Sequence, residues 1–287
     1  MEMKLNDLHC HSSLSACCAD KRMTPERILR HAEEAGYETI CLTDHLWDSA
    51  VPGASGWYAP QNIEHVRAAL PLPQAPSCHF YFGCETELPV NGVPALSREH
   101  FDLFDFVVIP VNHMHMAGLV RAEGVDTPEK MAVNIENRLE NLLEQNLPLR
   151  KIGLAHLTIG LMFREGRIAD VMHAMSEARL LRILKGYAAA GTGIDKHKQE
   201  DQDACGQSDR QDHRHKIAIL ADAGGRVRNP RLAQRHLYFL HIQHIEFLPV
   251  AGGCLKNNLT GRHLAVRADL CALYGLILQI YHELRIA

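Results

Sequence analysis

The chain has 287 residues, which suits one large α/β domain or one domain with a smaller appendage. Its apolar content of 46% and charged content of 22% are ordinary for a soluble globular protein, and the net charge of −4 argues against nucleic acid as a partner. Nine cysteines without a Cys-x-x-Cys pair favour neither a disulfide framework nor a zinc ribbon. The longest carboxyl-terminal apolar run, Cys271 to Ile280, is too short to span a bilayer. Since the amino terminus also lacks an apolar signal core, we expect a cytoplasmic protein with no membrane partner.

The first two thirds of the chain alternate strand and helix patterns. Thr24 and Thr127 are each followed by proline and glutamate. This pattern is typical of a helix start, because threonine caps the first turn and proline suits the first helical position. We expect helices from 24 to a stop at Gly36, at about 61–70, from 127 to near 146 and at about 167–190. We expect strands at 5–9, 38–43, 79–84, 104–111, 152–157 and from 191 onward. Strands separated by helices imply parallel βα units and a closed or nearly closed barrel.

The pattern changes after residue 195. The segment from Lys196 to Lys216 is polar and charged without apolar periodicity, which is typical of a loop or of disorder. A short apolar segment follows at 216–221, and 264–284 has a helical pattern. We therefore divide the chain into a barrel core at 1–195 and a divergent segment at 196–287 that is expected to complete the barrel.

Side chains that bind metals follow five consecutive predicted strands. In a His-x-His pair on a strand, both imidazoles lie on the same side because side chains alternate. In parallel barrels, functional groups lie at the carboxyl ends of the strands. The candidates at that end are His9, His11, Asp44, His45, Glu85, His113, His115 and His156. Three residues have an alternative role that involves no metal contact: His115 as a rim residue, Asp44 as a hydrogen-bond acceptor that orients His45, and Glu87 as a solvated neighbour.

Three motifs resemble the PHP (polymerase and histidinol phosphatase) superfamily of metal-dependent phosphoesterases. The family pattern Asp-Leu-His-x-His-Ser-x-Leu-Ser is matched from Asp7 to Ser15, and Cys-x-Asp-x-x-Met-Thr-Pro is similar to residues 18–25. The third motif, Thr-Asp-His, is matched from Thr43 to His45. The resemblance covers roughly residues 5–195. It implies a distorted (β/α)7 barrel of the TIM type with two or three metal ions at its carboxyl-terminal rim.

The resemblance also implies a set of metal ligands. His9, His11 and Glu85 would bind one ion, and Glu85 would bridge to a second ion held by His113 and His156. Asp20 and His45 would belong to a third site, with Cys17 and Cys18 near the Asp20 position. Zinc, manganese and iron all suit such histidine and carboxylate ligands.

The resemblance breaks where the family closes its site. The family has Glu-x-Asn on the sixth strand, which Asp195 only approximates, and Ser-Asp-Ala-His on the last strand, which is absent here. The segment from Ser208 to His213 only loosely resembles Ser-Asp-Ala-His. Asp222 follows a strand-like run but is not followed by the histidine of that motif. The abrupt change at 195 also resembles a reading-frame disruption.

The leading function hypothesis is hydrolysis of a small phosphomonoester by a metal-activated water, with no side chain assigned as the catalytic base. A catalytically impaired relative that binds metal at a partial site is the main alternative. A phosphodiesterase or nuclease of the same superfamily is another, and an amidohydrolase-like barrel is disfavoured by Glu85 and the Thr-Asp-His motif. The basic residues that could contact phosphate are not ranked by the sequence; they are Lys21, Arg22, Arg121, Arg164 and Arg167.

Overall fold

The computed structural model describes residues 5–157, 168–196 and 216–219. The strands are β1 (Leu5–Cys10), β2 (Tyr37–Leu42), β3 (His45–Leu46), β4 (His79–Thr86), β5 (Phe106–Pro110), β6 (Ile152–Ala155), β7 (Gly193–Lys196) and β8 (Lys216–Ile219). The α-helices are α1 (Pro25–Glu34), α2 (Ile63–Arg67), α3 (Pro128–Glu144), α4 (Ile168–Ala174) and α5 (Glu177–Ala190). Two 3-10 helices, η1 (Arg98–Leu103) and η2 (Leu149–Lys151), precede β5 and β6.

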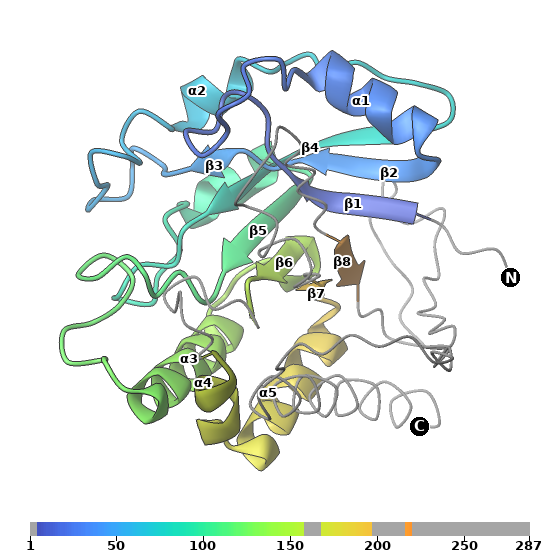
Figure 1. The fold of residues 1–287 in the computed structure, drawn as a ribbon. Helices are drawn as coiled ribbons and strands as arrows, with labels where there is room; N and C mark the ends of the chain where they lie inside the picture. Colours follow the sequence, from blue (N-terminus) through green and yellow to red (C-terminus); the bar gives the residue numbers. More distant parts are fainter. Residues whose placement is uncertain (1–4, 158–167, 197–215, 220–287) are drawn as a thin grey trace, which may run out of the picture.

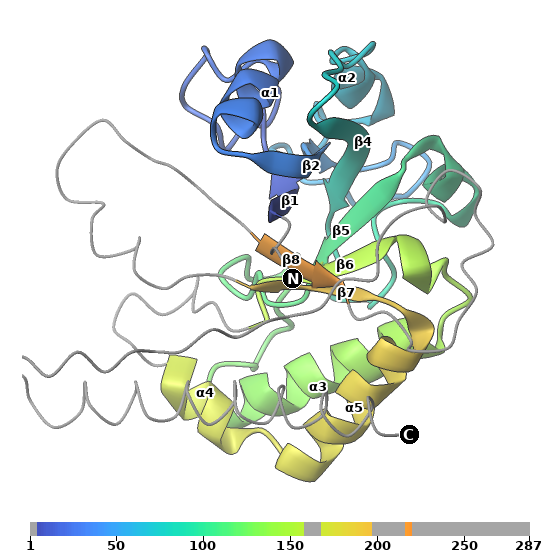
Figure 2. The ribbon, with the colours of Figure 1, turned by 90° about the vertical axis from the view of Figure 1, so that its right-hand side faces the viewer.

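The strands form one curled sheet in the order β1-β2-β4-β5-β6-β7-β8, with β3 paired to β4 beyond the end of β2 (Figure 1). All pairs are parallel except β7 with β8, which are antiparallel. The sheet curves so far that β8 comes into contact with β1, as both views show (Figure 2). Within the described segments no ladder joins these two strands, so they form an α/β barrel that is open at this seam.

Helices α1 and α2 lie at the β2 and β4 end of the sheet, whereas α3, α4 and α5 pack together beyond β5 to β7 (Figures 1 and 2). Successive side chains of β5 pack alternately into two different hydrophobic clusters. Val107 and Ile109 join the large cluster beneath α3 and α5, whereas Phe106 and Val108 lie in a small inner cluster with Leu8 of β1. The inner cluster lies on the concave side of the curl.

The local helix signals are confirmed. Thr24 and Thr127 cap α1 and α3 by accepting hydrogen bonds from the N–H groups of Arg27 and Lys130 at 3.4 Å. Gly36 follows α1 with φ 76°, a conformation that glycine adopts without a Cβ penalty.

Two predicted helices differ from the structure. The helix expected at about 167–190 is broken into α4 and α5, because Ser176 caps α5 and donates its own N–H to the Glu136 carboxylate of α3 at 2.6 Å. The helix expected at about 61–70 is only α2, which begins at its Asn62 cap. The short strand β3 and the antiparallel direction of β8 were not expected either.

Candidate metal centre

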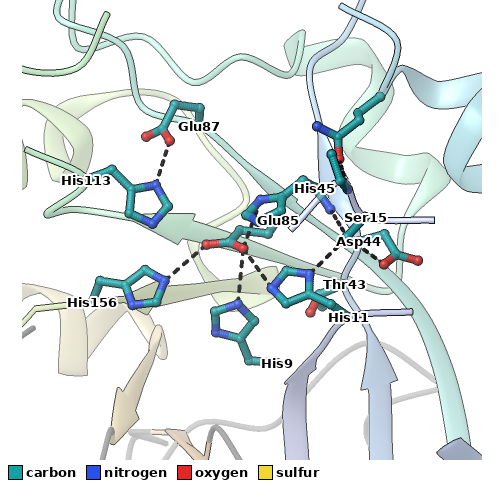
Figure 3. Close-up of polar contacts among 12 residues, drawn as sticks. His9, His11, Ser15, Thr43, Asp44, His45, Glu85, Glu87, His113 and His156 are labelled. Carbon is teal, nitrogen blue, oxygen red and sulfur yellow. Dashed lines mark hydrogen bonds and ion pairs between the residues drawn. The ribbon is translucent and has the colours of Figure 1, made fainter. Parts of the chain in front are cut away.

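The Glu85 carboxylate lies at the centre of four histidines. Its Oε2 atom lies 3.2 Å from Nε2 of His9, 3.1 Å from Nε2 of His11 and 3.1 Å from Nδ1 of His45. Its Oε1 atom lies 3.4 Å from Nε2 of His156. Figure 3 shows these imidazoles converging on the carboxylate. They come from β1 and the residue that follows it, from β3 and from the turn after β6.

Backbone pairing brings these groups together. β3 pairs with β4 in a register that places His45 directly opposite Glu85. Between Asp7 and Cys10, β1 has one more residue than the facing part of β2, and His9 lies in this irregularity. Such a bulge redirects a side chain, which lets His9 and His11 both reach the same carboxylate.

Gly83 of β4, two residues before Glu85, has no space for a side chain. A Cβ atom on Gly83 would lie 2.5 Å from the carbonyl oxygen of Phe106 and 2.7 Å from Sγ of Cys41. The glycine therefore allows β2, β4 and β5 to approach each other below the carboxylate.

His156 follows β6 in the left-handed conformation, with φ 61°. A residue with a Cβ atom adopts this conformation at a cost of about 1 kcal/mol or more, and such strain gathers at functional sites. The turn directs the ring of His156 toward Glu85 and places it 4.7 Å from the ring of His113.

The two oxygens of Glu85 face different histidine groups. Donor atoms of His9, His11 and Glu85 form one set within 4.8 Å of one another, and those of Glu85, His113 and His156 form a second. Ligands about 2.1 Å from one tetrahedral zinc ion are separated by about 3.4 Å, close to the nitrogen–oxygen distances observed here. The two sets share Glu85, whose Oε2 atom faces the first and whose Oε1 atom faces the second.

The burial of Glu85 favours a bound cation at this position. Glu85 is 1% exposed, and neither of its carboxylate oxygens has a hydrogen-bond donor within the described part of the chain. Burial lowers the pKa of His45 well below its usual value and that of His156 to about 4, so these imidazoles are neutral at pH 7. A buried carboxylate among neutral imidazoles matches the ligand set of a divalent transition metal.

The tautomer of His11 is set by Ser15 and Asp44. The Ser15 hydroxyl donates to Oδ1 of Asp44 at 2.6 Å and accepts the backbone N–H of His45 at 3.0 Å. With its proton donated to Asp44, the hydroxyl accepts from Nδ1 of His11 at 3.1 Å, which leaves the lone pair on Nε2. Asp44 also accepts two hydrogen bonds from Ser12. Asp44 thus contacts the backbone of His45 through Ser15 and orients the ring of His11, not that of His45.

Glu87 is not a solvated neighbour, and this prediction was wrong. The residue is 0% exposed, and its Oε2 atom accepts from Nδ1 of His113 at 2.7 Å and from the Tyr58 hydroxyl at 2.9 Å. Burial lowers the pKa of His113, but the Glu87 carboxylate outweighs this effect and raises it above its ordinary value. Because Nδ1 carries the hydrogen bond, Nε2 is the atom that His113 can offer to a metal.

Arg138 of α3 holds the loops that carry Glu87 and His113. Its buried guanidinium donates to the carbonyl oxygens of Leu88 and Pro89, which follow β4, and of Val111 and Val120, which follow β5. The two loops are therefore fixed relative to each other by a single side chain.

Asp20 is the predicted ligand that the structure does not bring to the centre. Its carboxylate accepts a bidentate interaction from the guanidinium of Arg22, and Arg27 lies 3.7 Å away. Hydrogen bonds from Arg22 lower the pKa of Asp20 to about 2. The third set of donor atoms within 4.8 Å of one another instead contains His11, Cys17 and His45.

The other candidates divide by position. His115 is exposed beside His113, at a ring distance of 5.4 Å, which agrees with a rim position. Arg22 is bound to Asp20, and Arg121 donates to the carbonyl oxygen of Val125. Several predicted groups lie outside what the structure describes: Arg164, Arg167, residues 208–213, Asp222 and the side chain of Asp195.

Several residues that support the centre were not predicted from the sequence, and only some of them lie in a local pattern that could have identified them. Glu87 stands two residues after Glu85, so the alternation of a strand places both carboxylates on one side. Ser12 and Ser15 lie within the matched motif from Asp7 to Ser15, but that motif does not state their roles. Tyr58 and Arg138 reach the site through long-range contacts that no local pattern predicts.

Comparison with known proteins adds little to this geometry. No protein-family model matches the chain, and no curated protein matches it. Among solved structures, the chain is similar to a zinc-, L-histidinol- and phosphate-bound histidinol phosphate phosphatase from Lactococcus lactis subsp. lactis Il1403. The identity is 15% and the TM-score 0.38, over 67% of this chain and 83% of that chain. So distant a likeness carries no argument about what this chain binds, and the candidate centre stands on its own residues.

Proposed function

We propose that the chain is a metal-dependent phosphoesterase that hydrolyses a small phosphomonoester with an activated water molecule. The observation that carries the proposal is the buried Glu85, whose two oxygens face two separate sets of histidines. The motif resemblance to the PHP superfamily supports the same conclusion and gives the phosphoester class.

The proposed ligands divide between two ions. His9, His11 and Glu85 hold the first, and Glu85, His113 and His156 hold the second. Bound divalent ions of this kind supply a water molecule with a lowered pKa and offset the charge of a phosphate group. The chain's own residues fix the donors: Ser15 keeps the lone pair of His11 on Nε2, and Glu87 does the same for His113.

The test is elemental analysis of the full-length protein together with hydrolysis of p-nitrophenyl phosphate in the presence of zinc or manganese. We expect two or more ions per chain and turnover that falls by about 100-fold or more in His9→Ala, since loss of a ligand exceeds the effect of losing its outer partners. The exposed His31 of α1 provides the matched control, and His31→Ala is expected to keep both metal and turnover.

Other outcomes separate the alternatives. One ion or none, with no turnover, would contradict the proposal and identify an impaired relative. Faster hydrolysis of bis(p-nitrophenyl) phosphate than of the monoester would instead indicate a phosphodiesterase.

A further inference from the structure

Two adjacent cysteines in the loop after His11 point in different directions. The thiol of Cys17 offers its sulfur within the same 4.8 Å set as His11 and His45. The thiol of Cys18 instead donates to the carbonyl oxygen of Asp20 at 3.5 Å. Only one of the two thiols therefore faces the metal centre.

Hydrogen bonds on both sides of Cys17 hold it in place. The N–H of Ala16 donates to Oε1 of the buried Gln61 at 2.8 Å, and the N–H of Cys18 donates to the carbonyl oxygen of Ser15 at 3.0 Å. The Ser15 side chain is in turn bound to the buried Asp44. The position of the Cys17 sulfur is thus set by buried groups of neighbouring segments.

His45 supplies an independent sign of a ligand. The residue is more than nine-tenths buried, and its Nδ1 atom, 3.1 Å from Oε2 of Glu85, has no hydrogen-bond partner in the described residues. A buried imidazole in this state suits a metal ion. The His11 ring stacks on that of His45 at 4.5 Å, but its Nε2 atom is assigned to the first ion of the proposed function.

Resting on the metal centre of the proposed function, we propose that this centre takes a third ion, which His45 binds together with Cys17 as a thiolate ligand. Cys17 thereby takes the role that the family resemblance assigns to Asp20. On binding, the S–H bond breaks, a sulfur–metal bond forms and the proton leaves to water. Because a thiolate is a soft ligand, this position selects zinc over manganese.

Cobalt provides the probe, since Co²⁺ takes zinc sites and a cobalt–thiolate bond gives a sulfur-to-metal charge-transfer band in the near ultraviolet. The metal-free full-length protein is titrated with Co²⁺ and its absorption recorded. We expect the band in the wild type and in Cys18→Ser, whose sulfur points away from the site, and its loss in Cys17→Ser.

A second variant covers the case in which Cys17→Ser loses the ion altogether. Cys17→Asp restores an anionic ligand through oxygen, so cobalt is retained without the band. We also expect the preference for zinc over manganese at this position to fall by about tenfold or more in Cys17→Asp.

The outcomes distinguish this inference from the proposed function. A band that survives in Cys17→Ser, or cobalt bound to the wild type without any band, overturns thiolate ligation even if the enzyme hydrolyses phosphomonoesters. A band lost only in Cys17→Ser and Cys17→Asp supports it, even if no turnover of p-nitrophenyl phosphate is found.

Discussion

At the scale of single residues, the candidate centre depends on carboxylates that orient imidazoles as much as on those that face a metal. Glu87 does not face a metal position, because its oxygens accept hydrogen bonds from His113, from Tyr58 and from the N–H of Leu88. Its anionic charge strengthens the hydrogen bond from Nδ1 of His113 and so makes Nε2 a better donor.

We therefore expect Glu87→Gln to weaken metal binding at the second ion by about 10- to 100-fold, the usual effect of losing such a partner. Competition with a chromophoric zinc chelator measures the change. The exposed Glu34 of α1 provides the matched control as Glu34→Gln, which should bind zinc like the wild type. Unchanged affinity in Glu87→Gln would mean that Glu87 only fills the space beneath His113.

Residue-level signals also explain which ligands were predictable. Each of His9, His113 and His156 stands in or just after a strand with a strong apolar pattern, so its place at one edge of the sheet follows from strand direction. The role of Asp20 did not follow, because its carboxylate is taken by Arg22 only two residues away. No sequence pattern states whether an acidic side chain finds a metal or an arginine.

At the scale of elements, Asp48 links the end of β3 to the start of η1. Its carboxylate accepts hydrogen bonds from the N–H groups of Ala50 at 2.9 Å and Ser97 at 3.0 Å and from Nδ1 of His100 at 2.6 Å. Burial raises the pKa of Asp48, but these hydrogen bonds outweigh burial and lower it below the ordinary value. The charged form is therefore stabilised in the folded state.

This shift fixes the sign of a pH dependence. The stabilisation is fully present above the unfolded-state pKa of about 4 and is lost as the pH falls through the lower folded-state value. We expect Asp48→Asn to reduce the free energy of unfolding by about 1–3 kcal/mol at pH 7, and the gap from wild type to shrink below about pH 4.

Urea unfolding of the metal-free proteins at several pH values measures this gap, because chelation removes the contribution of bound metal and the histidine ligands are the same in both proteins. Asp102→Asn in η1 is the control, since the Asp102 side chain is 82% exposed and its loss should change stability by less than about 0.5 kcal/mol. A gap that stays constant from pH 7 to pH 3 would show that the Asp48 charge does not stabilise the fold.

The predictability of elements follows the range of the contacts that form them. α1 and α3 were predicted because their caps lie within the helices' own sequence. The break before α5 was not, because Ser176 meets a carboxylate of α3 that lies 40 residues earlier in the chain. β3 has only two residues, and its pairing with β4 is a tertiary contact that periodicity does not register.

At the scale of the whole molecule, the proposed ligands come from strands and turns that are spread over most of the sheet. They come from β1, β3 and β4 and from the turns after β5 and β6, so bound ions tie together segments between residues 9 and 156. No helix of the described residues is long and apolar enough to cross a membrane. The division of the chain at residue 195 and the cytoplasmic location stay predictions.

Because the ligands come together only in the folded chain, metal ions should stabilise the native state by mass action. Zinc at 100 times its dissociation constant contributes about 2.7 kcal/mol, which for a domain of this size raises Tm by about 5–10 °C. We expect a chelator to lower the Tm of the wild type by this amount in a calorimetric scan, and added zinc to restore it.

Glu85→Gln separates metal stabilisation from ordinary packing, because it keeps the shape of the side chain but removes its charge. With zinc present, the variant should be less stable than the wild type and insensitive to the chelator. Without metal the order should reverse, since the wild type then keeps a buried carboxylate whose oxygens have no hydrogen-bond donor within the described segments. If metal-free Glu85→Gln were instead less stable than the metal-free wild type, protonated histidines would be holding the carboxylate, and the cluster would be stable in its own right as a set of ion pairs.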